Sequence, residues 1–262
     1  MKKTMIAPMD IRLMNLTAAL LLFGLTLLLL GELGAWLARH PMFSIAGISV
    51  RGDVRHDSES LLRKQVMSRL QGTFLTLDLQ AARQSFEALP WVRRAVVRRE
   101  FPNRLQVQLE EHRPTAFWGG GGAEPRLLNV QGEVFEVNLG ELEQEELPHL
   151  SGPDEQSAEV LSAYRALQPR LQAIGLNLRR LELTGRGNWR AEFDKDAVIE
   201  LGRGTAQEVE TRAARFVQTL PEVAARYGRT ASALLSADLR HQDGYAIRLH
   251  GVSTVPATQA RK

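Results

Sequence analysis

The sequence has 262 residues, of which 33 are basic and 30 acidic, so its formal net charge is +3. This near balance argues against a chain that binds nucleic acid over its whole surface. The absence of cysteine excludes disulfides, zinc–thiolate sites and cysteine nucleophiles. The length suits one or two domains.

A long apolar segment lies near the start of the chain. No residue between Leu13 and Gly31 is charged, and residues 27–30 are all leucine. A helix over residues 13–38, at ~1.5 Å per residue, exceeds the ~30 Å hydrocarbon core of a bilayer, and Trp36 suits its interface. The segment predicts a single transmembrane helix. A cleaved signal peptide is the alternative, but its apolar region is usually only about 7–15 residues.

The flanking charges give little guide to the orientation of this helix. Lys2, Lys3 and Arg12 precede it, and Arg39 and Arg51 follow it. Long domains translocate largely regardless of charge. We therefore expect residues 1–12 to form a cytoplasmic tail and the remainder of the chain to be exported.

Residues 43–112 predict a strand, two helices and two further strands. The first strand begins at Phe43, after Pro41, and Asp57 or Ser58 can cap a first helix. Asp78 can cap a second helix, which Pro90 stops. The last two strands flank a turn at residues 101–104.

These last two strands lie in an arginine-rich stretch, WVRRAVVRREFPNRLQVQLEEHRP, at residues 91–114. The stretch could be a basic patch for nucleic acid or an arginine-rich strand pair. Leu105, Val107 and Leu109 alternate with polar residues, which is typical of a strand with one buried face. If the domain is exported, the strand pair is the better interpretation, with some arginines pairing with Glu110 and Glu111.

The chain after Pro114 predicts a mixed sheet with two covering helices. Residues 119–122 form a glycine loop without the Lys-Ser/Thr of a phosphate loop. Residues 141–146 are an acidic run, which we interpret as a solvated loop. The predicted strands cover residues 126–130, 134–137, 178–183, 189–193 and 197–201, followed by a pair around residues 242–244. One helix begins at Ser157, and a second opens on the capping-box spacing of Thr205 and Glu208 and is expected to stop at Pro221.

The sequence carries no motif of a known catalytic or metal site. Its six histidines are scattered, with no HExxH, and neither G-x-S-x-G nor G-x-G-x-x-G occurs. Asp194 and Asp196 are interpreted as a solvated turn. We therefore expect no enzyme activity, no cofactor, no metal and no small-molecule substrate.

An ordered set of short motifs resembles the FtsQ/DivIB family of bacterial cell division proteins. The motifs are FSI at 43–45, VRG at 50–52, GTFLTLDL at 72–79, LPWV at 89–92, FP at 101–102, PTA at 114–116, GEVF at 132–135, LPHLSGP at 147–153, LGR at 201–203, RF at 215–216, ADLR at 237–240 and GYA at 244–246. Each motif is short, but together they keep the family's order.

The resemblance implies an α+β protein with one N-terminal transmembrane helix and two exported domains. Residues 43–112 would be a POTRA (polypeptide-transport-associated) domain with the order β-α-α-β-β. Residues 113–256 would be a β domain, a mixed sheet with covering helices, and residues 257–262 a flexible tail.

The resemblance further implies a non-catalytic scaffold of the division machinery. Such a protein sits in the inner membrane at the septum with its N-terminus in the cytoplasm and its bulk in the periplasm. It binds FtsB and FtsL, is linked to FtsK, FtsA, FtsN-type proteins and the FtsW/FtsI synthase, and helps control septal peptidoglycan synthesis. Nucleic acid is not among the expected partners.

In this family the last strands hold FtsB, which adds a strand at the sheet edge, a mode that uses the unpaired backbone groups of an exposed strand. The residues that correspond here are Arg186, Arg240, His241, Gly244, Tyr245, Ala246, Ile247 and Arg248. His241 stands where the family usually has tyrosine, and Tyr245 is expected to be partly core.

Two other functions remain as alternatives. A POTRA-type chaperone for exported or outer-membrane proteins would normally carry tandem POTRA repeats or a barrel, neither of which is apparent. A cytoplasmic nucleic-acid binder would use the arginines of residues 91–104 and would require the opposite topology.

Overall fold

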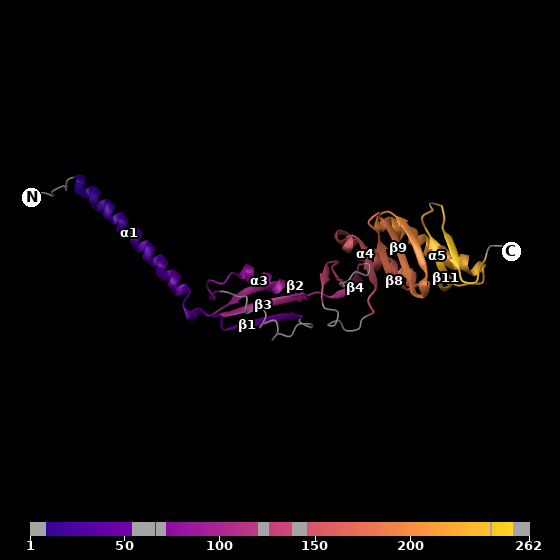
Figure 1. The fold of residues 1–262 in the computed structure, drawn as a ribbon, viewed down its shortest axis with the longest axis horizontal. Helices are drawn as coiled ribbons and strands as arrows, with labels where there is room; N and C mark the ends of the chain where they lie inside the picture. Colours follow the sequence, from indigo (N-terminus) through magenta and orange to yellow (C-terminus); the bar gives the residue numbers. More distant parts are fainter. Residues whose placement is uncertain are drawn as a thin grey trace, which may run out of the picture. The chain divides into compact units, whose positions relative to one another are not determined.

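The structure, a computed structural model, describes residues 9–53, 66, 72–119, 126–137, 146–241 and 243–253. Its chain forms two compact units, Met1–Glu111 and His112–Lys262 (Figure 1). The predicted helix after Asp57, apart from Val66, lies outside the described residues. So do residues 120–125, which include most of the glycine loop, residues 138–145, residue 242 and the two chain ends.

The first unit begins with the long apolar helix α1, Met9–Ala38. Its segment Leu13–Ala38 is long and apolar enough to cross a membrane, as the sequence predicts. Most leucines of this segment are more than half exposed, because no other described element covers them. An apolar helix that is uncovered on all sides suits a lipid environment rather than water.

A three-stranded sheet and one described helix follow α1. Their bounds are β1 Gly47–Asp53, α3 Leu79–Glu87, β2 Val92–Glu100 and β3 Arg104–Glu111. The central strand β3 pairs in parallel with β1 and antiparallel with β2. Asp78 caps α3 as predicted, since its carboxylate accepts from the N–H groups of Gln80 and Ala81. The first strand starts later than predicted, because residues Pro41–Phe43 form a 3-10 turn.

The core of this unit lies between α3 and one face of the sheet. It contains Ala82 and Phe86 of α3, Ala95 of β2 and Leu105 and Val107 of β3. Alternate residues of β2 and β3 therefore face solvent, which explains the mixture of arginine and valine in β2.

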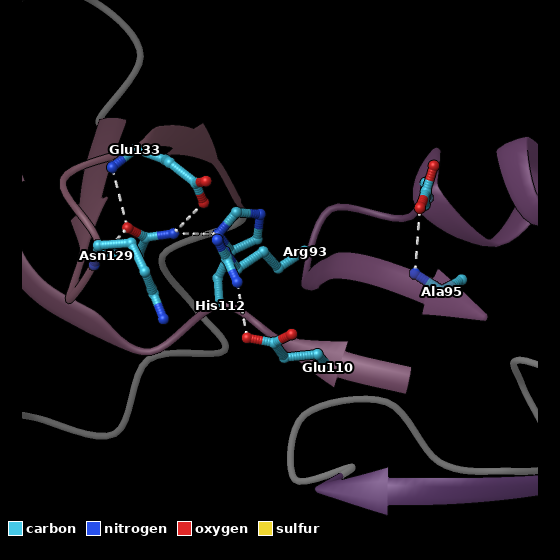
Figure 2. A network of polar contacts seen from close by, with 8 residues as sticks. Arg93, Ala95, Glu110, His112, Asn129 and Glu133 are labelled. Carbon is cyan, nitrogen blue, oxygen red and sulfur yellow. Dashed lines mark hydrogen bonds and ion pairs between the residues drawn. The ribbon is translucent and has the colours of Figure 1, made fainter. Parts of the chain in front are cut away.

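Two arginines of β2, Arg93 and Arg99, make different kinds of contact. Arg93 forms the predicted pair with Glu110, 2.7 Å from Nη1 to Oε1 (Figure 2). Arg99 instead donates from Nε to the carbonyl of Phe74, at 2.6 Å, and from Nη2 to that of Leu77, at 2.7 Å. Arg99 thus fastens the segment before α3 to β2, a structural role that the sequence did not indicate.

The described residues of the second unit form a nine-stranded mixed sheet with helices packed on it. Its strands are β4 Pro114–Trp118, β5 Arg126–Asn129, β6 Val134–Glu136, β7 His149–Ser151, β8 Leu178–Leu183, β9 Asn188–Phe193, β10 Val198–Arg203, β11 Leu234–Asp238 and β12 Ala246–Leu249. They lie in the order β12-β11-β10-β9-β8-β7-β4-β5-β6. The α+β class and the mixed sheet are confirmed. Strands β4 and β7 were missed; β7 has only three residues and forms only parallel pairs with distant segments.

Two helices pack on one face of this sheet, α4 Ser157–Gln172 and α5 Ala206–Arg226. The capping box at Thr205 and Glu208 forms as predicted. The predicted stop at Pro221 is wrong, because α5 continues through it to Arg226. Ala224, beyond the proline, is fully buried in the core, so packing outweighs the loss of one helical hydrogen bond.

The opposite face of the sheet is charged. Arg180 and Arg190 lie 3.7 and 3.5 Å from carboxylate oxygens of Glu192, and Arg190 also lies 3.4 Å from Glu200. The inward-facing neighbours on the same strands, Leu181 and Ala191, are buried. The sheet therefore has one packed and one wet face.

Asn129 closes the turn between β5 and β6. Its Oδ1 accepts from the N–H groups of Gln131 and Glu133, both at 2.9 Å, and its Nδ2 donates to Glu133 Oε2 at 2.7 Å (Figure 2). Nδ2 also lies 2.9 Å from His112 Nδ1, which must accept because an amide nitrogen can only donate. The buried amide is fully satisfied, so this turn is rigidly specified.

Candidate partner-binding edge

Strand β12 lies at one end of the nine-stranded sheet. It pairs antiparallel with β11, with Ala246 opposite Asp238 and Ile247 opposite Ala237. In the part of the chain that the structure describes, no strand pairs with its other side. An edge of this kind presents backbone N–H and C=O groups to which an extended segment of another protein can pair.

The side chains of β12 alternate between the core and solvent. Leu249 is buried and Ile247 packs against the core, whereas Ala246 and Arg248 are exposed. The strand is held to its own domain by one face. Its other face and its outer backbone edge are accessible.

Tyr245 anchors the start of β12 to α5. Its hydroxyl lies 2.7 Å from Thr219 Oγ1, and its ring meets Phe216 edge to face with 5.0 Å between centroids. The expectation that Tyr245 is partly core is confirmed, because it packs half-buried against the domain core.

Arg240 forms a chelated ion pair with Asp238, at the end of β11. Arg240 donates from Nε to Asp238 Oδ1 at 2.8 Å and from Nη2 to Oδ2 at 2.6 Å. These hydrogen bonds lower the pKa of Asp238 to about 2 and raise the pKa of Arg240. The Arg240 side chain is 61% exposed, and its Nη1 has no partner among the described residues. Nη1 is free to bind a second carboxylate.

The remaining predicted residues lie on both sides of the β11–β12 connection and elsewhere. His241 and Gly244 are exposed, and a Cβ added to Gly244 would meet no atom within 4 Å, so this glycine does not constrain the turn. Arg186 is exposed in the turn between β8 and β9, so strands β10 and β11 separate its hairpin from β12. The structure thus brings together Arg240, His241 and residues 244–248 but leaves Arg186 about three strand spacings, or ~14 Å, across the sheet.

Two hollows flank β12, and sequence reasoning found neither. One, of about 750 Å³, lies on the helical side and is lined by Val223, Tyr227, Leu235, Leu249 and Val252, among others. The other, of about 300 Å³, lies over Val198, Glu200, Ser236, Asp238 and Ala246. Only the three-dimensional neighbourhood joins these residues, although Asp238, two positions before Arg240, could have been recognised as its partner.

The pair between Asp238 and Arg240 predicts an effect of replacing the arginine. In Arg240→Gln the pKa of Asp238 should rise toward 3.8, because its charge-assisted hydrogen bonds are lost. A depressed carboxyl pKa contributes stability above pH 3.8, which is lost as the pH falls toward 2. The contribution to the free energy of unfolding should be small, because solvent screens this exposed pair.

An NMR titration of the Asp238 side chain tests this effect. Arg248→Gln, an exposed cation on the neighbouring strand that makes no pair with Asp238, serves as the control and should leave its pKa near 2. An unchanged Asp238 pKa in Arg240→Gln would contradict the pairing.

Comparison with known proteins agrees with this architecture. Residues 43–112 match the family model described as POTRA domain, FtsQ-type, and residues 116–240 match that of cell division protein FtsQ/DivIB, C-terminal. The second match ends at Arg240, so β12 lies beyond it.

Several curated relatives are similar over most of their length. Cell division protein FtsQ of Thiomonas arsenitoxydans is 37% identical over 94% of this chain and 89% of its own. Those of Burkholderia pseudomallei and Bordetella pertussis are 37% and 34% identical, over 97% and 92% of this chain and 98% and 92% of theirs. With both domain models matched in order, this chain belongs to the FtsQ/DivIB family of cell division proteins.

Proposed function

We propose that this chain is a non-catalytic scaffold of the division machinery whose β12 edge binds FtsB. Membership of the FtsQ family supports a role in cell division. The single observation that carries the binding mode is the position of β12, paired on one side only within the described chain.

In this proposal residues 1–12 lie in the cytoplasm, residues 13–38 span the inner membrane, and residues 43–112 and 113–256 form the periplasmic POTRA and β domains. The helix supports anchoring by its length and composition. The protein acts at the septum, where it links FtsB and FtsL to the FtsW/FtsI synthase and to FtsK, FtsA and FtsN-type proteins.

The partner strand would extend the sheet beyond β12. Backbone hydrogen bonds supply affinity in this mode, and side chains near the strand supply specificity. Arg240 Nη1, Arg248 and, farther away, Arg186 offer cations to an acidic partner, while Ile247 and the hollow beside Tyr227 and Val252 offer apolar surface. A partner that alternates acidic and apolar side chains fits this edge best.

Strand β6 provides a matched control, because it too is paired on one side only among the described residues. Strand β6 lies at the opposite end, and its Glu136 is exposed as Arg248 is. If β12 is the binding edge, a photo-crosslinking residue at Ala246 or Arg248 should capture FtsB in growing cells, and one at Glu136 should not. Each variant must be tested as the only copy of the protein in the cell.

Two results would contradict the proposal. If the residue at Glu136 captured FtsB as efficiently as those at Ala246 and Arg248, FtsB would not bind β12 selectively. Capture of no small bitopic protein at either β12 position, in cells that divide normally, would exclude this edge as the FtsB site.

A further inference from the structure

Three segments of the first unit meet at the end of the domain that is nearest in the chain to α1. They are residues 41–46, 72–77 and 99–104, here called the proximal end. The N–H of Ala46 donates to the carbonyl of Asn103 at 2.9 Å, and that of Phe74 donates to Phe43 at 2.7 Å. Arg99 joins the second and third segments through its bonds to Phe74 and Leu77.

The proximal end is also fastened to α1 itself. Thr73 Oγ1 donates to the carbonyl of Ala38, the last residue of α1, at 2.7 Å. The segment after α1 is short, and residue 42 can lie no more than ~14 Å from residue 38. Wherever α1 ends in a bilayer, the proximal end must lie close to that bilayer's surface.

Exposed apolar side chains are concentrated at the proximal end. Outside α1, the large apolar side chains that the described chain exposes are Met42, Leu75, Val96, Phe101 and Tyr227. Three of these five, Met42, Leu75 and Phe101, belong to the proximal end. Phe101 is 87% exposed, more than any of the exposed apolar residues of α1.

The cations around these side chains suit an anionic surface. Arg39 and Arg104 are exposed, and Arg99 remains exposed while it holds the Leu75 segment. Glu100 is the acidic residue within the three segments. Apolar side chains surrounded by basic ones are the pattern of a surface that enters the headgroup layer.

We propose that the proximal end inserts Leu75 and Phe101 into the headgroup layer of the bilayer that α1 spans. Contact at three points, α1, Leu75 and Phe101, would restrict the tilt of the POTRA domain relative to the membrane. The inference rests on the membrane-spanning role of α1 in the proposed function. It does not depend on the partner that binds β12.

Single labels can test this contact, because the chain contains no cysteine. The full chain is reconstituted into vesicles of phosphatidylethanolamine and phosphatidylglycerol, with a polarity-sensitive fluorophore on Leu75→Cys or Phe101→Cys. Met42→Cys reports whether α1 has inserted. Gln108→Cys, exposed on β3 and ~13 Å along the strand from Arg104, is the control.

The labels at positions 75 and 101 should show a blue-shifted emission and quenching by lipids spin-labelled near the headgroup, close to the values at position 42. The label at 108 should resemble one in water. If the label at position 42 is quenched but the labels at 75 and 101 behave like the one at 108, the proposed contact is excluded. The insertion of α1 into the bilayer is then still supported. If position 42 is also unquenched, α1 has not inserted, and the anchoring in the proposed function fails with it.

A second pair of variants tests whether the two side chains act together. With the label at position 75, Phe101→Ser should lower the quenching. Val96→Ser, at an exposed apolar residue of β2 outside the proximal end, should leave it unchanged. Equal quenching in the two variants would show that Phe101 takes no part in the contact.

Discussion

Replacing Gly132 by alanine is expected to destabilise the β domain by about 2–5 kcal/mol. Gly132 has φ +88°, and a Cβ there would lie 2.7 Å from Ala158 Cα and 2.8 Å from Ala158 Cβ, in the first turn of α4. Left-handed backbone costs a non-glycine residue ~1–2 kcal/mol, and overpacking costs ~1–3 kcal/mol more. The Ser157 hydroxyl donates to the Gly132 carbonyl at 2.7 Å. This bond holds the start of α4 against the turn, so α4 cannot shift away from an added Cβ without breaking it.

Urea denaturation and hydrogen exchange of β5, β6 and α4 measure this effect. Gly187→Ala is the matched control, because Gly187 also has positive φ, +76°, but open space where its Cβ would lie. It should cost only the backbone term, ~1–2 kcal/mol. Equal destabilisation by the two substitutions would show that the contact with α4 relaxes without cost.

Replacing Phe216 by alanine is expected to cost ~3–5 kcal/mol and to loosen the edge strand. Phe216 is fully buried in α5, and its removal leaves a cavity in the core. Its ring also supports Tyr245, which begins the segment leading into β12. The ratio of the hydrogen-exchange rate of the β12 amides to that of the β9 amides should therefore be higher in Phe216→Ala than in the unsubstituted protein.

Two controls separate the general loss of stability from the local one. Phe193→Ala removes another buried phenylalanine, in β9, and should destabilise similarly without singling out β12. Tyr245→Phe removes only the hydroxyl bonded to Thr219 and should cost ~0.5–1.5 kcal/mol. If Phe193→Ala loosens β12 as much as Phe216→Ala does, the support of the edge through Tyr245 is wrong.

Both predictions concern residues that the motifs singled out but did not explain. Gly132 and Phe216 lie within motifs by which the chain resembles its family, and the structure gives each a physical reason. Gly132 permits a close approach between a turn and a helix, and Phe216 joins the core to the candidate binding edge.

The elements found correctly from the sequence are those with local causes. The caps at Asp78 and Thr205 depend on residues two or three positions away, and α1 depends on composition alone. Alternation likewise identified β3, because its period records which face is buried. The stop predicted at Pro221 failed because burial of Ala224, a tertiary effect, overrode a local rule.

The partner-binding role of the candidate residues stays a prediction. Of these residues, Ala246, Ile247 and Arg248 lie on the edge strand β12, and Arg240, His241, Gly244 and Tyr245 lie between β11 and β12. Arg186 lies on another hairpin, and the pairing of Arg240 with Asp238 and both hollows beside β12 were not predicted. The position of Arg186 and the two hollows depend on which strands are neighbours, and strand order cannot be read from alternation, whereas the pair between Arg240 and Asp238 is local.

The sequence by itself determined the long apolar helix α1, the caps and most strands, because each follows from local composition or from contacts between near neighbours. Only the tertiary structure decided that β12 is an edge, that Arg99 fastens the segment before α3, and that the segments carrying Leu75 and Phe101 meet beside the end of α1. These depend on backbone pairing and packing between residues tens of positions apart, and similar alternating segments could pair in many other orders.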